Sequence, residues 1–79
     1  VWAVGLNYRS HLGARTPPRQ PEIFLKPTTC LQEPEEPIVI PPGAHNVHFE
    51  AELVIVIGEK IRRASLEEAR AAIFGYTCG

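Results

Sequence analysis

Two glutamates, Glu50 and Glu52, lie two positions apart just before five consecutive aliphatic residues at 53–57. Side chains alternate between the two faces of a β-strand, so a strand here would place both carboxylates on one face, in line with His48. Their Cβ atoms would then be about 6–7 Å apart. Carboxylates this close repel each other, and a divalent cation or a shared proton relieves the repulsion.

The same glutamates could instead lie on the solvent face of a half-exposed strand. The five aliphatic residues favour burial of both faces from Leu53 onward, and so favour the mouth of a cavity. Carboxylate oxygens suit hard cations such as Mg²⁺, Mn²⁺ or Ca²⁺, but two carboxylates are too few for a tight site. His48 could be a third ligand, although we expect it to support the ligands from behind or to be an ordinary strand histidine.

Three further side chains could act in catalysis or substrate binding: His11, Lys26 and Arg9. His11 follows the first predicted strand, and an imidazole can serve as a general base near neutral pH. Lys26 ends a predicted strand, where its ammonium group could meet an anionic substrate, and Arg9 is a similar case. For all three, a solvated surface side chain is the alternative interpretation.

Composition narrows the class of protein. The chain has 79 residues and a formal net charge of −1, which gives no electrostatic case for binding nucleic acid or an anionic membrane. The longest wholly apolar run, 53–57, is far shorter than the roughly 20 residues that span a bilayer. Two cysteines, Cys30 and Cys78, are too few for a disulfide scaffold and favour a reduced, cytoplasmic protein. The absence of Met and the abrupt ends suggest a segment of a larger protein.

Prolines and glycines divide the chain into short elements. Strands are predicted at 1–5, 22–26, 38–40 and 47–57, and a further strand could start at 76–78. A turn or short helix is predicted at 8–14 with Asn7 as its N-cap, while the three prolines within 15–21, and the stretch 28–37, predict loops. Ser65 and Glu68 match a capping box for a helix from about Leu66 to Phe74, ended by Gly75. The fold class is therefore α+β, mostly β.

Five ordered segments together resemble the fumarylacetoacetate hydrolase family: Val4-Gly5-Leu6-Asn7-Tyr8-Arg9-Ser10-His11, Ile23-Phe24-Leu25-Lys26-Pro27, Pro37-Ile38-Val39-Ile40-Pro41, His48-Phe49-Glu50-Ala51-Glu52-Leu53 with Val56-Ile57-Gly58, and Ala72-Ile73-Phe74-Gly75-Tyr76-Thr77. The resemblance implies that residues 1–79 are part of a catalytic domain with a rolled, mixed β-sheet, with one short helix near 66–74 and the rest of the domain after Gly79. It also implies a homodimer.

The resemblance implies an enzyme that acts on small 2-oxo or 1,3-dioxo acids. Hydrolysis of acylpyruvates or fumarylpyruvate, decarboxylation of oxo-diacids and isomerisation of unsaturated acids are the reactions it suggests. In such enzymes a pair matching Glu50 and Glu52 binds Mg²⁺ or a similar ion together with an Asp. That Asp would lie beyond Gly79, because this chain has no Asp.

The sequence departs from the family pattern at one position near the catalytic histidine. His11 matches the histidine that activates water, and many members carry a Glu three residues later, where this chain has Ala14. Lys26 and Arg9 are candidates to orient the substrate, and 15–21 corresponds to the lid. A non-catalytic relative kept for binding or assembly is the rival interpretation that Ala14 motivates. An unrelated β domain with exposed glutamates fits the ordered segments less well.

Overall fold

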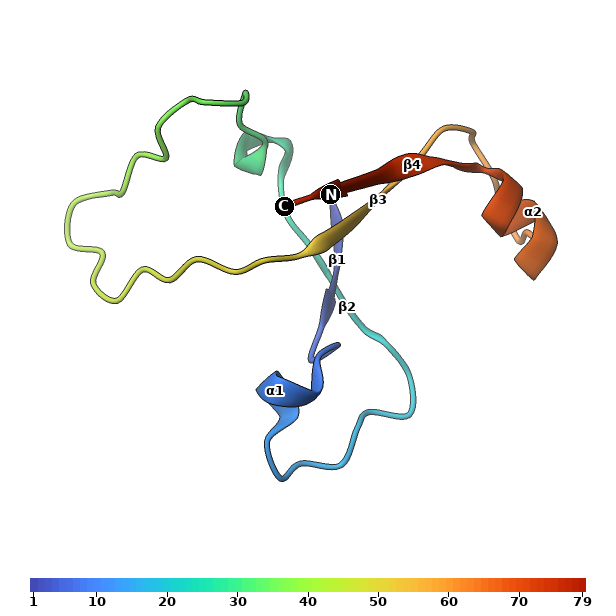
Figure 1. The fold of residues 1–79 in the computed structure, drawn as a ribbon, viewed down its shortest axis with the longest axis horizontal. Coiled ribbons are helices and arrows are strands. Elements are labelled where there is room, and N and C mark those ends of the chain that lie inside the picture. The colour runs from blue at the N-terminus through green and yellow to red at the C-terminus, as the bar shows by residue number, and fades with distance from the viewer. The chain divides into compact units, whose positions relative to one another are not determined.

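The computed structural model describes all residues from 1 to 79 and divides them into two compact units, Val1–Val39 and Ile40–Gly79. Each unit contains a separate two-stranded antiparallel sheet, and Figure 1 labels the strands and α-helices. The predicted α+β class, with more strand than helix, is confirmed. None of the helices has the length and apolar character that crossing a membrane requires.

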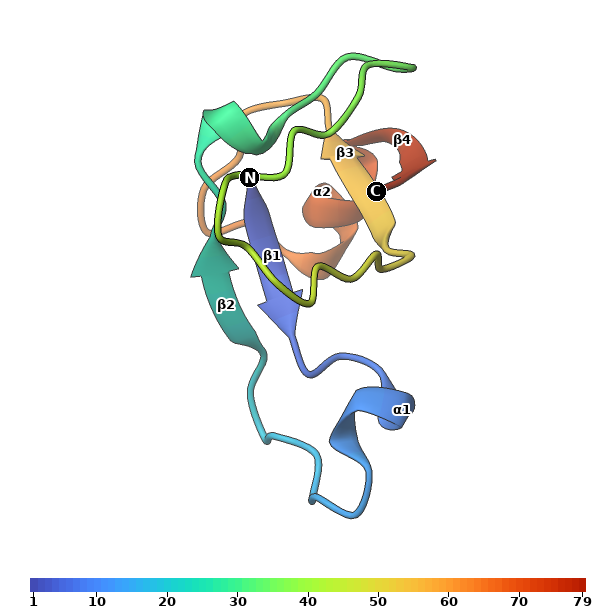
Figure 2. The same ribbon diagram turned by 90° about the vertical axis from the view of Figure 1, so that its left-hand side faces the viewer.

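The first unit is organised around a hairpin of β1 (Trp2–Gly5) and β2 (Glu22–Leu25), seen in Figure 2. The pairing continues for one more residue on each strand. The amide of Lys26 donates to the carbonyl of Val1 and the terminal amino group of Val1 donates to the carbonyl of Lys26, both at 2.9 Å. The strands predicted at 1–5 and 22–26 are confirmed.

The connection between β1 and β2 contains α1 (Arg9–Leu12), a short helix within the turn or helix predicted at 8–14. Its N-cap is Tyr8, with φ −113° and ψ 137° and no side-chain cap, and the predicted cap at Asn7 is wrong. Leu6 has φ 52°, which turns the chain before the helix. The helix begins at Arg9, one residue later than predicted. Leu12 is 8% exposed and is the one buried apolar side chain of this unit.

In the sequence between β2 and β3 there is one regular element, a 3-10 helix at Thr28–Cys30 within the predicted loop. The strand predicted at 38–40 is wrong. Prolines at 37, 41 and 42 lack the amide donors that a ladder requires, and no other segment pairs with this one. Ile38 and Val39 are accordingly 81% and 83% exposed.

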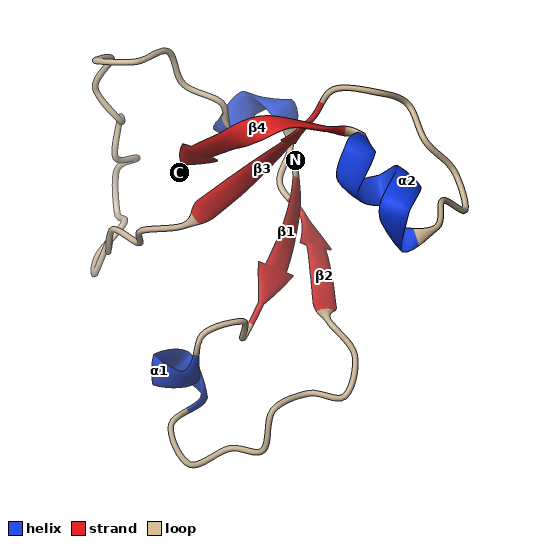
Figure 3. Ribbon diagram, turned by 45° about the vertical axis from the view of Figure 1, so that its right-hand side comes forward, coloured by secondary structure: helices blue, strands red, loops and turns tan.

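The second unit pairs β3 (Leu53–Ile57) with β4 (Ile73–Cys78), with α2 (Leu66–Ala71) in the connection between them, as Figure 3 shows. Val56 lies opposite Gly75 and Ile57 opposite Ile73, so β4 has one additional residue at this point. That residue is Phe74, the extra residue of a β-bulge, and its side chain is 82% exposed.

The strand predicted at 47–57 begins only at Leu53. One further backbone pair, between Glu52 and Gly79, precedes it. No strand pairs with residues 47–51, because β4 faces β3 and its last residue, Cys78, already lies opposite Leu53. The strand face that would carry Glu50 and Glu52 together is therefore not formed.

Helix α2 begins with the predicted capping box. The amide of Glu68 donates to Ser65 Oγ at 3.2 Å, and the amide of Ser65 donates to Glu68 Oε2 at 2.7 Å. The helix ends at Ala71, three residues before the predicted end at Phe74. Gly58 donates to the carbonyl of Ala72 at 2.8 Å, so pairing with the end of β3 directs the chain into β4 before the helix can continue.

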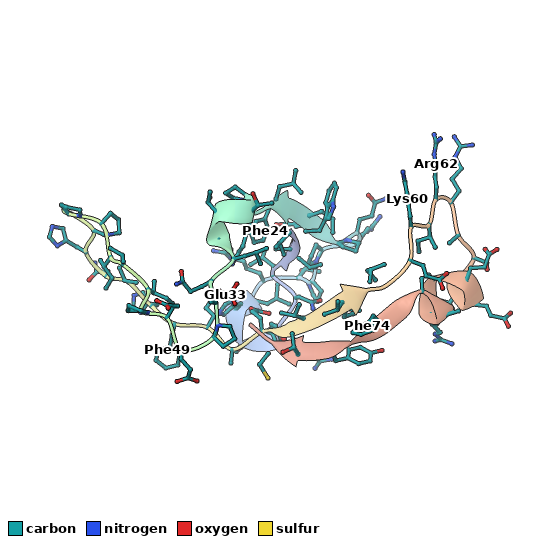
Figure 4. The ribbon with its side chains drawn as sticks, turned by 90° about the horizontal axis from the view of Figure 1, so that it is seen from above. Phe24, Glu33, Phe49, Lys60, Arg62 and Phe74 are labelled. Atoms are coloured by element: carbon teal, nitrogen blue, oxygen red, sulfur yellow. The ribbon has the colours of Figure 1, made fainter.

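The prediction that both faces of the aliphatic strand are buried is wrong for these 79 residues. Leu53, Ile55 and Ile57 are 64%, 49% and 55% exposed. A two-stranded sheet offers one hydrogen-bonding partner and no layer to cover its faces. Figure 4 shows Phe74 on β4 and also Phe49, which is 96% exposed.

Candidate functional site

A cavity of about 300 Å³ lies at the end of the β1–β2 hairpin where the two strands separate. Gly5 and Glu22 form the last paired position, and beyond them the chain diverges into α1 on one side and the proline-rich loop on the other (Figure 2). The cavity is lined by Val4, Gly5, Leu6, Asn7, Arg9, Leu12, Pro17, Pro18, Arg19, Gln20 and Pro21.

The lining combines positive charge with amide groups. Arg9 from α1 and Arg19 from the loop are its two charged residues, and no acidic residue belongs to it. Asn7 and Gln20 add side-chain amides that can donate or accept hydrogen bonds. The buried side chain of Leu12 contributes apolar surface. An anion of small size is the ligand that this chemistry suits.

His11 lies on α1 two residues after Arg9, is exposed, and does not line the cavity. Its backbone amide donates to the carbonyl of Tyr8 at 3.0 Å, which closes the first turn of the helix. The chain then leaves the helix at Gly13, with φ 55° and ψ −122°. Ala14 follows this turn, so the residue three positions after His11 lies beyond the helix end.

Lys26 lies at the opposite end of the hairpin from the cavity. Its backbone pairs with Val1 next to the pair of Trp2 and Leu25, whereas the cavity adjoins the pair of Gly5 and Glu22. The two pairs are four residues apart along each strand, or about 13 Å. Of the predicted substrate-binding residues, the cavity therefore brings in Arg9 and not Lys26.

The predicted metal ligands belong to the second unit. Glu52 is half-buried and its backbone is fixed by the pair with Gly79, while Glu50 and His48 are exposed and precede the ladder. Nowhere in residues 1–79 do three or more His, Cys, Asp or Glu side chains gather as a metal site would require. The carboxylate chemistry suits a hard cation, but these residues alone do not complete its coordination.

Three polar or charged residues of the cavity lining were not among the site candidates from sequence: Arg19, Asn7 and Gln20. The available signal was the density of prolines around Arg19. Pro17, Pro18 and Pro21 each fix a backbone φ and so restrict the loop that carries Arg19.

Comparison with known proteins identifies the family of this chain. The family described as fumarylacetoacetate (FAA) hydrolase C-terminal matches residues 1–79, the whole chain. This chain belongs to the fumarylacetoacetate hydrolase family. The family predicted from the ordered segments is thereby confirmed. No solved structure gives a significant match.

Three curated relatives illustrate the family. Protein Rv2993c of Mycobacterium tuberculosis is 46% identical over 82 residues, covering 100% of this chain and 31% of the relative. The 4-hydroxyphenylacetate degradation bifunctional isomerase/decarboxylase of Salmonella dublin is 40% identical, over 98% of this chain and 18% of the relative. Oxaloacetate tautomerase YcgM of Escherichia coli is 40% identical, over 96% of this chain and 36% of the relative. The chain thus spans about a third of the length of these relatives, or less.

Proposed function

We propose that residues 1–79 are part of the catalytic domain of an enzyme that acts on small 2-oxo or 1,3-dioxo acids. The family match over the whole chain is the observation that carries this proposal. Relatives named as an oxaloacetate tautomerase and as an isomerase/decarboxylase support an enzymatic role. The cationic cavity beside α1 supports an acidic substrate, because its two charged residues are Arg9 and Arg19.

Tautomerisation, isomerisation or decarboxylation fits this chain better than hydrolysis. Hydrolysis needs a base that activates water, and a carboxylate beside His11 would assist it. Ala14 cannot provide that carboxylate, and it lies past the turn at Gly13. In the other reactions His11 would move a proton to or from the substrate carbon or oxygen without activating water.

We propose Glu50 and Glu52 as two carboxylate ligands of a divalent cation, Mg²⁺ with Mn²⁺ or Ca²⁺ as alternatives. Both are hard oxygen donors, as such cations prefer, and the remaining ligands would come from outside residues 1–79, from water or from substrate. When bound, the cation would polarise the 2-oxo group and stabilise an enolate. His48 would support the ligands, and Arg9, which lines the cavity, would orient the substrate.

We also propose that the full-length protein is a cytoplasmic homodimer. The competing hypothesis is a non-catalytic relative that keeps the fold for binding or assembly, for which the absence of an acid at Ala14 is the supporting feature. The two hypotheses differ in turnover and not in fold.

The full-length protein should be assayed with oxaloacetate, an acylpyruvate and an unsaturated oxo-diacid, with Mg²⁺ and then with excess EDTA. The enzyme hypothesis predicts turnover of at least one substrate, loss with EDTA and recovery with added Mg²⁺. His11→Ala should lower the turnover number by about a hundredfold or more, as loss of a general acid or base does. Absence of turnover with every substrate and metal would favour the non-catalytic relative.

A further inference from the structure

We propose that the cavity at the end of the β1–β2 hairpin is a dicarboxylate site, in which Arg9 and Arg19 each bind one carboxylate of a small dianion. The inference rests on the proposed function only in naming an oxo-diacid as the natural ligand. The cavity lies entirely within the unit Val1–Val39.

The first argument is charge. Arg9 and Arg19 both line one cavity of about 300 Å³ whose lining includes no acidic residue. Two like charges that line one cavity repel each other, and a ligand with two negative charges relieves this repulsion. A monoanion would leave one guanidinium unmatched.

The second argument is geometry of recognition. A guanidinium offers parallel N–H donors that match the two oxygens of a carboxylate, so arginine binds carboxylates in a bidentate manner. Arg9 comes from α1 and Arg19 from the proline-rich loop, so the two arginines reach the cavity from different elements. This arrangement suits a ligand with a carboxylate at each end of a short carbon skeleton.

The third argument concerns the rest of the lining. Leu12 provides a buried apolar surface for the carbon skeleton, and the amides of Asn7 and Gln20 can hydrogen-bond a ketone or enol oxygen between the carboxylates. The volume is at the lower end of the range for ligand pockets, as a ligand of a few carbon atoms requires.

The fourth argument is preorganisation. Arg19 is held between Pro18 and Pro21, with Pro17 before them, and each proline fixes a backbone φ. A loop restricted in this way loses less conformational entropy when a ligand immobilises it. Arg15, in the same connection but outside the cavity lining, offers a matched control for any effect of charge alone.

The test measures binding of succinate and of butyrate to the full-length protein by isothermal titration calorimetry, in EDTA so that metal does not contribute. We expect the wild type to bind succinate more tightly than butyrate. Arg9→Gln and Arg19→Gln should each weaken succinate binding by about tenfold or more. Arg15→Gln should leave it unchanged, and Arg19→Lys should recover part of the loss.

Kinetics with an oxo-diacid and an oxo-monoacid provide the second measurement. Arg19→Gln should raise KM for the diacid, with a smaller change in kcat and little change for the monoacid. Equal binding of succinate and butyrate, or equal effects of Arg15→Gln and Arg19→Gln, would overturn the dicarboxylate site even if the enzyme is active. Selective succinate binding without turnover of any oxo acid would instead overturn the proposed function and leave the site standing.

Discussion

Glu52 and Gly79 exchange a pair of backbone hydrogen bonds. The amide of Glu52 donates to the carbonyl of Gly79 at 2.8 Å, and the amide of Gly79 donates to the carbonyl of Glu52 at 3.0 Å. This pair extends the β3–β4 ladder by one residue and fixes the backbone of one proposed metal ligand. The other proposed ligand, Glu50, lies two residues earlier and precedes the ladder. The position of Glu52 therefore depends on the close approach of Gly79.

Replacing Gly79 with alanine should disturb this pair. A Cβ at position 79 would lie 2.6 Å from Cγ2 of Val54, closer than real Cβ contacts, and the β-branched valine has little freedom to move away. We expect Gly79→Ala to loosen the backbone of Glu52 and to weaken Mg²⁺ binding by the full-length protein by about tenfold. Calorimetric titration with Mg²⁺ measures the change.

Gly75→Ala is the control for this prediction. Gly75 is also on β4, but a Cβ there would meet no atom within 4 Å. The Mg²⁺ affinity of the Gly75→Ala variant should match that of the wild type. If Gly79→Ala also bound Mg²⁺ as the wild type does, the position of Glu52 would not depend on this backbone pair.

The capping box should stabilise α2 measurably. Ser65→Ala removes the oxygen that accepts a hydrogen bond from the amide of Glu68, leaving that amide without its partner at the helix start. We expect a decrease of about 1 kcal/mol in the free energy of unfolding. Urea denaturation of the full-length protein measures it. A variant with unchanged stability would show that the cap contributes nothing to the folded protein.

The same motif predicts a dependence of stability on pH. Hydrogen bonds from the backbone amide and then the side chain of Ser65 lower the pKa of Glu68 from its ordinary value of 4.5. Between the lowered value and 4.5 the unfolded state binds more protons, so stability rises with pH across that window. The contribution is present above pH 4.5 and is lost as pH falls through the folded-state pKa.

Glu68→Gln should flatten this part of the stability profile, while Glu67→Gln, in the same helical turn but outside the capping box, should not. Thermal unfolding measured at several pH values below 5 distinguishes the two variants. Equal slopes for Glu68→Gln and Glu67→Gln would contradict the assignment of the pH dependence to the capping box.

Gly13 should be needed for the end of α1. Its φ of 55° and ψ of −122° are unfavourable for residues with a Cβ, although a Cβ would meet no atom within 4 Å. The effect of Gly13→Ala is therefore conformational, and we expect a loss of about 1–3 kcal/mol in the free energy of unfolding. Urea denaturation checks this, with Gly75→Ala as a control because the φ of Gly75 is not positive. Equal stability of the two variants would contradict it.

The features predicted correctly from the sequence depend on neighbouring residues. The Ser65 and Glu68 cap is a contact between residues three apart, and the strands at 1–5 and 22–26 are separated by prolines and glycines that mark their limits. Local chemistry decides such features, and it is fully present in the sequence.

The incorrect predictions concern features that depend on contacts between residues distant in the sequence. Residues 47–51 have the alternation of a strand, but β4 provides no residue to pair with them. Helix α2 stops at Ala71 because Ala72 bonds to Gly58 and begins the pairing with β3. Arg19 was not singled out because the cavity that it lines is formed together with α1, which a linear pattern does not reveal.

Calorimetric titration of the full-length protein with Mg²⁺ tests the central proposal of a cation held by Glu50 and Glu52. Glu50→Gln and Glu52→Gln replace each carboxylate with an amide of the same shape, so charge is removed while side-chain volume is kept. Glu59→Gln, just after β3 and exposed, removes the same charge outside the proposed site. We predict that Glu50→Gln and Glu52→Gln each weaken binding by about tenfold or more while Glu59→Gln does not. Wild-type Mg²⁺ affinity in both Glu50→Gln and Glu52→Gln would contradict the proposal.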